Sequence, residues 1–469
     1  MRMIHCPTVF RQFLFPFLFA GLSATAQDPA ALLKKKSDEL SADGQFRFAI
    51  MGFHVADAAT GKTVFERNGR VGLLPASSQK VLTAAAALDL LGPDFRYRTK
   101  FGYTGQVAGG LLDGRLTVEG DGDPTLGSDR FPGTAPAVLE AALAAAMRKA
   151  GIRKVTGGIA GIIPGFEKAS IPRGWLWEDI GNYYGAGHGG LNWHENQYEL
   201  WLKPGAAEGD PVAITRTDPE LHGITFDNEL LTGRAGSGDE AYLFFKPGSP
   251  GLVVRGTVPC CQGTFRIAGA VMDPVLFTLR QLQRATGTEG PVEVFHRKGE
   301  YDTGRVQELY THLSPSLDSV VYWFLQRSVN LYGEAFLHSM SLRAGGKASF
   351  EAGADGMRDF WADKGIERHA VNIVDGSGLS PQNRVTAEAL VKALLYARQR
   401  PWFPVFNRAM PVHNGIRMKS GSMGGVRSYA GYVKSGSGRE YVFAVIVNNF
   451  SGTGASVNRK LWEMLDLLK

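Results

Sequence analysis

Alternating apolar and polar positions predict β-strands near both ends of the chain. Residues 46–57 (FRFAIMGFHVAD) alternate along most of their length, and residues 63–67 complete a hairpin across a turn at 59–62. Residues 428–433 and 441–448 show the same pattern near the C-terminus. Because such strands pack one face against helices, we expect both ends of the chain to meet in one antiparallel sheet.

Helical periodicity separates these strands. The first predicted helix starts near Ala76 and ends at the stop signal Gly92-Pro93. Further helices are expected over residues 317–342, 348–364 and 386–398, with a last one from Ser456. Helices of this kind would flank the sheet, so the predicted fold class is α+β.

The middle of the chain has a different composition. Residues 98–295 are rich in Gly and Pro and contain short strand-like runs such as 116–118, 158–163 and 251–254. We therefore expect a β-rich insertion there, which interrupts one domain formed by residues 27–97 and 296–469.

The N-terminus has the pattern of a secretory signal. Arg2 and Arg11 precede the apolar run 13–22, and small residues follow at 24–26, which predicts a signal peptide of residues 1–26 cleaved near Ala26. The run is short for a spanning helix, and no later stretch has about 18 apolar residues. We expect a soluble periplasmic protein without a transmembrane anchor, and a retained anchor is the alternative.

Charge and cysteine usage exclude several classes. The 469 residues carry a net charge of +6 without a basic block, so nucleic-acid binding is not indicated, although a weakly basic surface suits a carboxylate-bearing polymer. Cys6 lies in the predicted signal, and Cys260 and Cys261 are adjacent, so no disulfide framework is expected. A vicinal bridge and two separate thiols both remain open.

The first candidate for chemistry opens the first predicted helix. Ser77 and Lys80 are three residues apart, so on a helix they share a face with Cβ atoms about 5–6 Å apart. A serine hydroxyl needs a base to become a nucleophile, and a lysine with a lowered pKa can be that base. Alone the pattern is weak, because Ser77 could cap the helix while Lys80 faces solvent.

A second candidate is the triplet Ser328-Val329-Asn330 in a helical region. A serine hydroxyl can relay a proton between base and leaving group, and an asparagine amide can hold both a lysine and a substrate carbonyl. The similar triplet 456–458 fits a cap of the last helix better.

The third candidate is Lys419-Ser420-Gly421-Ser422, which leads into the strand ending at 433. A lysine and two hydroxyls would bind a terminal carboxylate, the glycine would let a substrate backbone approach, and a strand N–H could complete an oxyanion hole. The repeated triplet 434–436 is explained by a hairpin turn. The order S-x-x-K, S-x-N and K-S-G is the set found in β-lactamases and penicillin-binding proteins.

With these motifs the chain resembles the low-molecular-mass class C penicillin-binding proteins, the penicillin-binding protein 4 type of D-alanyl-D-alanine carboxypeptidase and endopeptidase. The likeness also covers segments 74–77, 91–96, 122–126, 375–380 and 383–384. It implies a penicilloyl-serine-transferase (β-lactamase-like) domain, whose antiparallel sheet has flanking helices and whose insertion forms two small β-rich domains.

The resemblance also implies roles for the candidate residues. Ser77 would be the nucleophile and Lys80 its base, with Ser328 as the proton relay and Asn330 positioning the substrate. The terminal carboxylate would be held by Lys419, Ser420 and Ser422, and the oxyanion by the N–H groups of Ser77 and Ser422.

An acidic residue in the insertion completes the expected site. The family places an aspartate there that receives the amino group of a diaminopimelate side chain, and Trp177-Glu178-Asp179 resembles that segment. Asp179 is the candidate, and a turn or cap is the structural alternative.

Two departures affect the motifs rather than the chemistry. Ser420 replaces the commoner threonine, which keeps the hydroxyl, and Val329 stands where aspartate is frequent.

The predicted reaction is acyl transfer on Ser77 from peptidoglycan stem peptides, with β-lactams as covalent inhibitors and with carboxypeptidase and endopeptidase cleavage equally compatible. No metal or cofactor is expected, since His188 and His194 near Glu195 lack zinc-ligand spacing. The alternatives are a β-lactamase-like hydrolase and a non-catalytic wall-binding protein.

Overall fold

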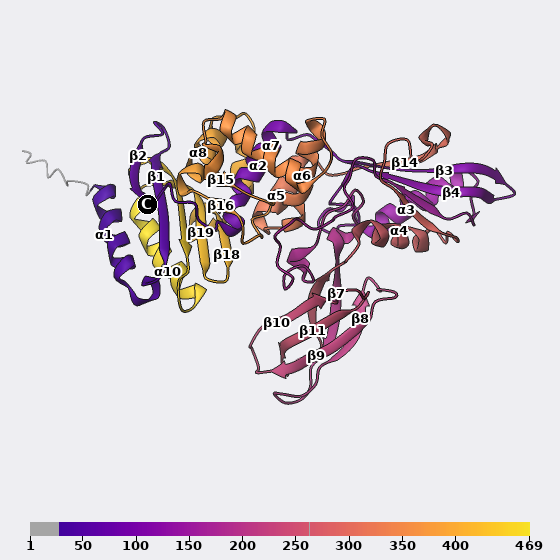
Figure 1. Ribbon diagram of the computed structural model, residues 1–469, viewed down its shortest axis with the longest axis horizontal. Coiled ribbons are helices and arrows are strands. Elements are labelled where there is room, and N and C mark those ends of the chain that lie inside the picture. The colour runs from indigo at the N-terminus through magenta and orange to yellow at the C-terminus, as the bar shows by residue number, and fades with distance from the viewer. Residues whose placement is uncertain (1–27, 262) are drawn as a thin grey trace, which may run out of the picture.

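The computed structural model describes residues 28–261 and 263–469. A six-stranded sheet with helices lies at one end of the molecule, a second sheet at the opposite end, and a small two-sheet lobe to one side (Figure 1). The predicted signal peptide, residues 1–26, lies outside the described residues. Across 28–261 and 263–469, we find no helix with both the length and the apolar character needed to span a bilayer.

The first sheet joins the two ends of the chain. Its strand order is β17-β18-β19-β20-β1-β2, and β1 pairs with β20 along its whole length. All neighbours in this sheet are antiparallel. The strands are β1 (Ile50–Asp57), β2 (Thr63–Arg67), β17 (Val412–His413), β18 (Ile416–Met423), β19 (Val426–Lys434) and β20 (Glu440–Asn448).

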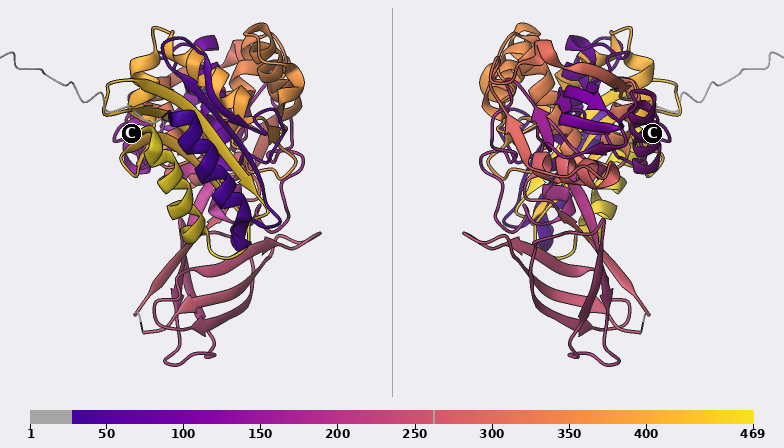
Figure 2. Two further views of the ribbon diagram at one scale, coloured as in Figure 1. Left: turned by 90° about the vertical axis from the view of Figure 1, so that its left-hand side faces the viewer. Right: turned by 90° about the vertical axis from the view of Figure 1, so that its right-hand side faces the viewer.

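Helices cover both faces of this sheet. Alternate residues of β20 belong to two cores: Ala444 packs with α2 and α8, and Val445 packs with α1 and α10. Figure 2 shows α1 and α10 side by side on the second face. The helices of this part are α1 (Pro29–Ala42), α2 (Lys80–Leu90), α5 (Leu317–Gln326), α6 (Asn330–Arg343), α7 (Phe350–Asp363), α8 (Ala387–Arg398), α9 (Phe403–Ala409) and α10 (Gly454–Leu465). The α+β prediction is confirmed.

The middle of the chain builds the other parts. The second sheet has the order β13-β6-β4-β3-β14, with β5 beside β4, and packs on two helices that the sequence analysis missed. Its elements are β3 (Arg98–Ala108), β4 (Leu111–Gly120), α3 (Pro136–Lys149), β5 (Lys154–Val155), β6 (Ile159–Ile162), α4 (Pro274–Ala285), β13 (Val292–Phe295) and β14 (Gln307–Leu313). Since β14 pairs with β3, this sheet continues past residue 295, and we propose that the insertion ends near residue 313.

The lobe consists of two three-stranded sheets that enclose an apolar core. One sheet has the order β10-β11-β9, and the other has the order β12-β7-β8. The strands are β7 (Gln197–Lys203), β8 (Ala213–Asp218), β9 (Phe226–Gly233), β10 (Glu240–Phe245), β11 (Leu252–Pro259) and β12 (Phe265–Ala270). A two-stranded pair, β15 (Val371–Asn372) and β16 (Arg384–Val385), lies between α7 and α8 in the chain.

Three predicted elements differ in ways that shape the site. The predicted helix 317–342 is divided into α5 and α6 at Ser328, whose φ of 57° is left-handed. The first helix opens with a 3₁₀ turn, Ala76–Gln79, before α2. Lys419 lies within β18, a strand of its own, rather than before the strand ending at 433. A left-handed serine or a 3₁₀ start leaves no periodicity signal, which explains the first two errors.

Candidate active site

Ser77 lies on a strained turn. Ala76 before it has a left-handed φ of 46°, a conformation that residues with a side chain seldom adopt. Gly378, with a φ of 83°, packs directly on the Ala76 carbonyl, and a Cβ at this position would collide with that oxygen. In a 3₁₀ turn, side chains three residues apart eclipse each other, so this geometry brings Ser77 and Lys80 together more directly than an α-helix would.

Lys80 is fully buried, and its Nζ donates three hydrogen bonds. The acceptors are Ser77 Oγ at 2.9 Å, Asn330 Oδ1 at 2.7 Å and the Ser377 carbonyl at 2.6 Å. Burial, and then the nearby Lys419 charge, lower the pKa of Lys80 well below its usual range. A neutral Lys80 could still donate to Asn330 and Ser377 while accepting the Ser77 proton. The arrangement therefore suits a general base.

Asn330 connects this base to the insertion. It is the first residue of α6, and its amide nitrogen donates to the Tyr184 carbonyl at 2.8 Å. With its oxygen on Lys80, the side chain is fixed at both ends. Ser328, two residues earlier, is half-buried at the left-handed junction of α5 and α6.

Lys419 and Gly421 lie on the face of β18 that packs on the Ser77 turn. Lys419 is only 2% exposed, and burial lowers its pKa to about 7. A methyl group at position 421 would lie 2.5 Å from the Pro75 carbonyl and 2.8 Å from the Ser78 nitrogen, so only glycine allows this approach. Gly421 was predicted to let a substrate backbone approach, and its observed contact is with the Ser77 turn.

Ser420 and Ser422 project from the opposite face of β18. They pair with Tyr429 and Arg427 of β19, whose side chains share that face. The Ser422 hydroxyl is exposed and accepts a hydrogen bond from Arg427 Nη1 at 2.5 Å. The structure thus brings together Ser77, Lys80, Asn330 and Lys419, while Ser420 and Ser422 extend along the neighbouring surface.

Two buried carboxylates behind Lys80 were not predicted. Glu334 accepts from the N–H groups of Gly376 at 2.9 Å and Ser377 at 3.0 Å, which fixes the peptide carrying the Lys80 acceptor. Burial and then Asp375 raise the pKa of Glu334 to about 8. Because Glu334 is four residues after Asn330 on one helix face, this spacing was the available signal.

Asp375 fixes the loop that supplies Ser377. Its carboxylate accepts from Gly378 N at 2.9 Å, Ser380 N at 2.6 Å and Trp175 Nε1 at 2.9 Å. Its carbonyl accepts from Gln79 Nε2 at 2.7 Å, which joins the loop to the nucleophile turn. The segment 375–380 was part of the family resemblance, but its sequence alone gave no role.

Asp179 lies in a turn beside the site. Its carbonyl accepts from Asn182 N at 3.0 Å, as the structural alternative predicted, and its half-buried carboxylate lies beside the Tyr184 side chain. Burial raises the pKa of Asp179, and the nearby Tyr184 hydroxyl opposes this rise. The Tyr184 carbonyl accepts a hydrogen bond from Asn330, so this one tyrosine links the Asp179 carboxylate to Asn330.

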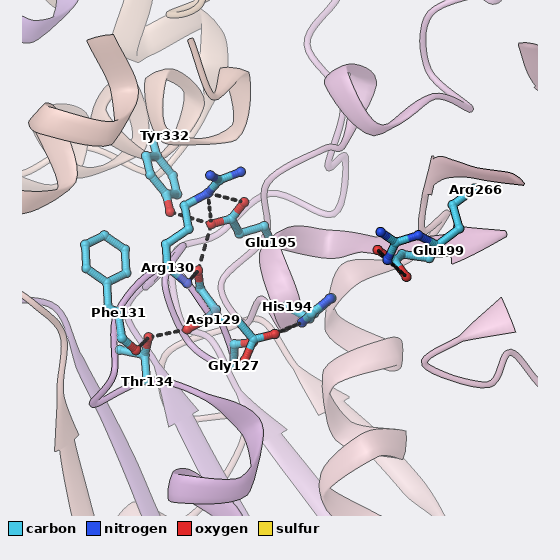
Figure 3. Close-up of polar contacts among 11 residues, drawn as sticks. Gly127, Asp129, Arg130, Phe131, Thr134, His194, Glu195, Glu199, Arg266 and Tyr332 are labelled. Atoms are coloured by element: carbon cyan, nitrogen blue, oxygen red, sulfur yellow. Dashed lines mark hydrogen bonds and ion pairs between the residues drawn. The ribbon is translucent and has the colours of Figure 1, made fainter. Parts of the chain in front are cut away.

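Glu195 has a structural position away from the catalytic cluster. Figure 3 shows its carboxylate at the centre of a polar network between the insertion and α6. It accepts from Arg130 Nε at 2.8 Å and from the Tyr332 hydroxyl at 2.7 Å. Tyr332 is on α6, so this network attaches the insertion to the helix that carries Asn330.

A serine against a buried lysine, on a helix beside an antiparallel sheet, defines a serine hydrolase of the Ser–Lys type with a β-lactamase-like fold. The chain belongs to the D-Ala-D-Ala carboxypeptidase 3 (S13) family, which it matches over residues 33–468. It is therefore a serine-type D-Ala-D-Ala carboxypeptidase, and the predicted family is confirmed.

Named relatives agree with this assignment. A D-alanyl-D-alanine carboxypeptidase from Actinomadura sp. (strain R39) is 28% identical over 483 residues, which cover 94% of this chain and 86% of the relative. D-alanyl-D-alanine carboxypeptidase DacB from Haemophilus influenzae is 23% identical over 430 residues, 86% of each chain. The crystal structure of penicillin binding protein 4 (dacB) from H. influenzae has the same fold, with a TM-score of 0.75, 22% identity, and coverage of 91% of this chain and 97% of that one.

Proposed function

We propose that Ser77 is the acylated nucleophile and Lys80 its general base. The observation that carries this assignment is the Lys80 amine, which is buried with a lowered pKa and lies 2.9 Å from Ser77 Oγ. A lysine held neutral by its surroundings can remove the hydroxyl proton as the oxygen attacks. The order of the three motifs and the family resemblance predicted the same pair.

The reaction proceeds by two acyl transfers. Ser77 Oγ attacks the carbonyl of the penultimate D-alanine while its proton moves to Lys80. The tetrahedral intermediate then expels D-alanine, whose amine receives a proton through Ser328. Water attacks the Ser77 ester, Lys80 accepts its proton, and the shortened peptide leaves with serine regenerated. The N–H groups of Ser77 and Ser422 are the proposed oxyanion donors.

The free edge of β18 is the proposed substrate platform. In the described chain, β17 pairs with β18 only at Ile416 and Arg417, which leaves residues 419–423 without a strand on that side. An extended peptide could add there as a further strand. Its terminal carboxylate would then meet Lys419, Ser420 and Ser422, while Asn330 would contact its carbonyl.

Two finer assignments concern the substrate and the type of cleavage. We assign Asp179 to the amino group of a diaminopimelate side chain, supported by its half-buried carboxylate beside Tyr184. Endopeptidase cleavage uses the same chemistry with a larger leaving group, so we propose both activities.

The H. influenzae structure exists as a β-lactam complex, which supports β-lactam acylation here. We also propose export to the periplasm, supported by the predicted signal at 1–26.

Acylation by benzylpenicillin tests the nucleophile. We would follow intact mass for the wild type and a Ser77→Ala variant, and measure D-alanine release from a stem pentapeptide. A single penicilloyl adduct on the wild type alone, together with release, supports the proposal. Rapid penicillin turnover would favour a β-lactamase-like hydrolase. A folded wild type with neither adduct nor release would favour the wall-binding alternative.

A further inference from the structure

A row of exposed aromatic side chains borders the active site. β10 is an edge strand, and its inward residues Leu243 and Phe245 are buried in the core of the lobe. Its outward residues are Tyr242, which is 47% exposed, and the half-buried Phe244. Polar residues are expected on a solvent-facing edge strand. An aromatic surface at this position therefore indicates an interaction site.

The row continues onto the loop 176–184 and is held by specific bonds. Trp177, 53% exposed, has its ring centroid 4.9 Å from that of Phe244, which lies 6.4 Å from that of Tyr242. Trp177 Nε1 donates to the Phe245 carbonyl at 2.9 Å, and Leu243 N donates to Asn182 Oδ1 at 3.1 Å. These bonds occupy the free edge of β10, so the strand and the loop form one surface.

This surface is continuous with the catalytic cluster. The loop that bonds to β10 through Asn182 also carries Tyr183 and Tyr184, and the Tyr184 ring is 5.4 Å from that of the exposed Tyr183. The Tyr184 carbonyl binds Asn330 at 2.8 Å. Figure 1 places β10 on the side of the lobe that faces the first sheet. A ligand that extends from Asn330 would therefore meet these rings next.

Resting on the proposed function, we propose that this row, Trp177, Tyr183, Tyr242 and Phe244, binds the glycan strand that carries the stem peptide. A stem peptide is attached to an amino sugar, so a surface continuous with the peptide site would contact that sugar when the peptide is bound. Sugar rings have an apolar C–H face that stacks on aromatic rings, and hydroxyl groups at their edges that need polar partners. Glu178 and the Arg255–Glu229 ion pair supply such partners at the rim.

Peptide substrates with and without the sugar test this proposal. We would compare D-alanine release from a free pentapeptide and from the same peptide on a GlcNAc–MurNAc disaccharide, using the wild type and a Tyr242→Ser/Phe244→Ser variant. We expect the disaccharide to lower the wild-type KM about tenfold and the variant to lose this advantage. Activity of the variant on the free pentapeptide should stay within twofold. Phe48→Ser, at an exposed aromatic outside this row, is the matched control.

Equal wild-type KM values for both substrates, or a full sugar advantage in the variant, would overturn the glycan assignment while leaving carboxypeptidase activity intact. Failure of the wild type to release D-alanine from any substrate would instead count against the proposed function. In that case, peptide-free glycan chains are titrated into the wild type and into the Tyr242→Ser/Phe244→Ser variant. Saturable binding by the wild type alone supports the glycan site, and no binding by either protein contradicts it.

Discussion

The two halves of α6 carry buried polar groups with different degrees of hydrogen bonding. In the first half, both oxygens of Glu334 accept backbone N–H groups, and Asn330 is bonded at both ends of its amide. In the second half, His338 lies 2.8 Å from His188 of the insertion, Nδ1 to Nδ1, but its Nε2 has no hydrogen bond in the described chain. The first half positions Lys80, and the second joins two parts of the molecule.

Counting protons shows why the second half stays incomplete. His188 Nε2 is 2.8 Å from the Gly122 carbonyl and must donate to it, so a neutral His188 accepts at Nδ1 and His338 donates from Nδ1. A neutral His338 then has a bare Nε2, which faces Glu167 at 3.6 Å as acceptor against acceptor. One more proton would complete the chain, but burial lowers the pKa of both histidines. Substitutions in the first half should therefore slow acylation strongly, whereas substitutions in the second half should lower stability and leave the acylation rate nearly unchanged.

The largest effect is expected from Lys80→Met. Loss of the base should slow acylation of Ser77 by about a thousandfold or more. Stability should also fall, by about 1–3 kcal/mol, because methionine leaves the Asn330 amide oxygen and the Ser377 carbonyl without their buried donor. Stopped-flow penicillin acylation and thermal unfolding measure the two effects. Acylation within tenfold of the wild type would show that another group is the base.

Glu334→Gln should have the next largest effect on catalysis. An ionised carboxylate only accepts, whereas the amide places an NH₂ against the N–H of Gly376 or Ser377 and shifts the Lys80 acceptor. We expect acylation to slow about 10- to 100-fold. Glu334 raises the pKa of Lys80 only while it is ionised, and its own pKa is about 8, so Glu334→Gln should alter the pH–rate profile mainly above pH 8.

The matched control for this change is Glu351→Gln on the exposed start of α7. Loss of rate in Glu334→Gln without any change in the pH–rate profile above pH 8 would indicate a purely structural role for this carboxylate.

The difference between the two halves also explains what sequence could reveal. Ser77, Lys80 and Asn330 were candidates because each belongs to a short motif of recognisable side-chain chemistry, and the structure brings all three together. Glu334 acts on backbone N–H groups more than 40 residues away, so its role depends on tertiary contacts that no local pattern encodes. The helix α4 was missed although Asp273-Pro274 is a standard start signal, because the surrounding Gly and Pro content outweighed it.

His338→Phe should lower stability with little effect on the acylation rate, unlike Lys80→Met and Glu334→Gln. The phenyl ring keeps the ring shape but removes the donor to His188 Nδ1, which leaves a buried acceptor unsatisfied at a cost of about 1–3 kcal/mol. Acylation should stay within about threefold. Urea unfolding and acylation rates test both statements, and a loss of rate without a loss of stability would show that this half also serves catalysis.

Asp123→Asn should reduce the pH dependence of stability. Burial raises the pKa of Asp123 to about 6, and its Oδ2 lies 3.9 Å from His312 Nε2 without a hydrogen bond. A raised carboxyl pKa contributes stability that is complete below about pH 4 and is lost as the pH rises through 6. The variant should therefore be more stable than the wild type at pH 8, by about 1–2 kcal/mol, and less dependent on pH. Unfolding midpoints at pH 4 and pH 8 measure this difference.

Ser420→Thr should have the smallest effect. It restores the commoner Lys-Thr-Gly while keeping the hydroxyl, and the added methyl lies on a half-buried strand position opposite Tyr429, where β-branched residues are favoured. The kcat/KM for D-alanine release should change less than threefold. The chain contains its own control, Ser435→Thr, in the identical triplet 434–436, which the structure places in the β19–β20 hairpin turn. A tenfold change in kcat/KM for Ser420→Thr with none for Ser435→Thr would mean that the added methyl group contacts the substrate. The Ser420 face of β18 would then contribute to substrate selection.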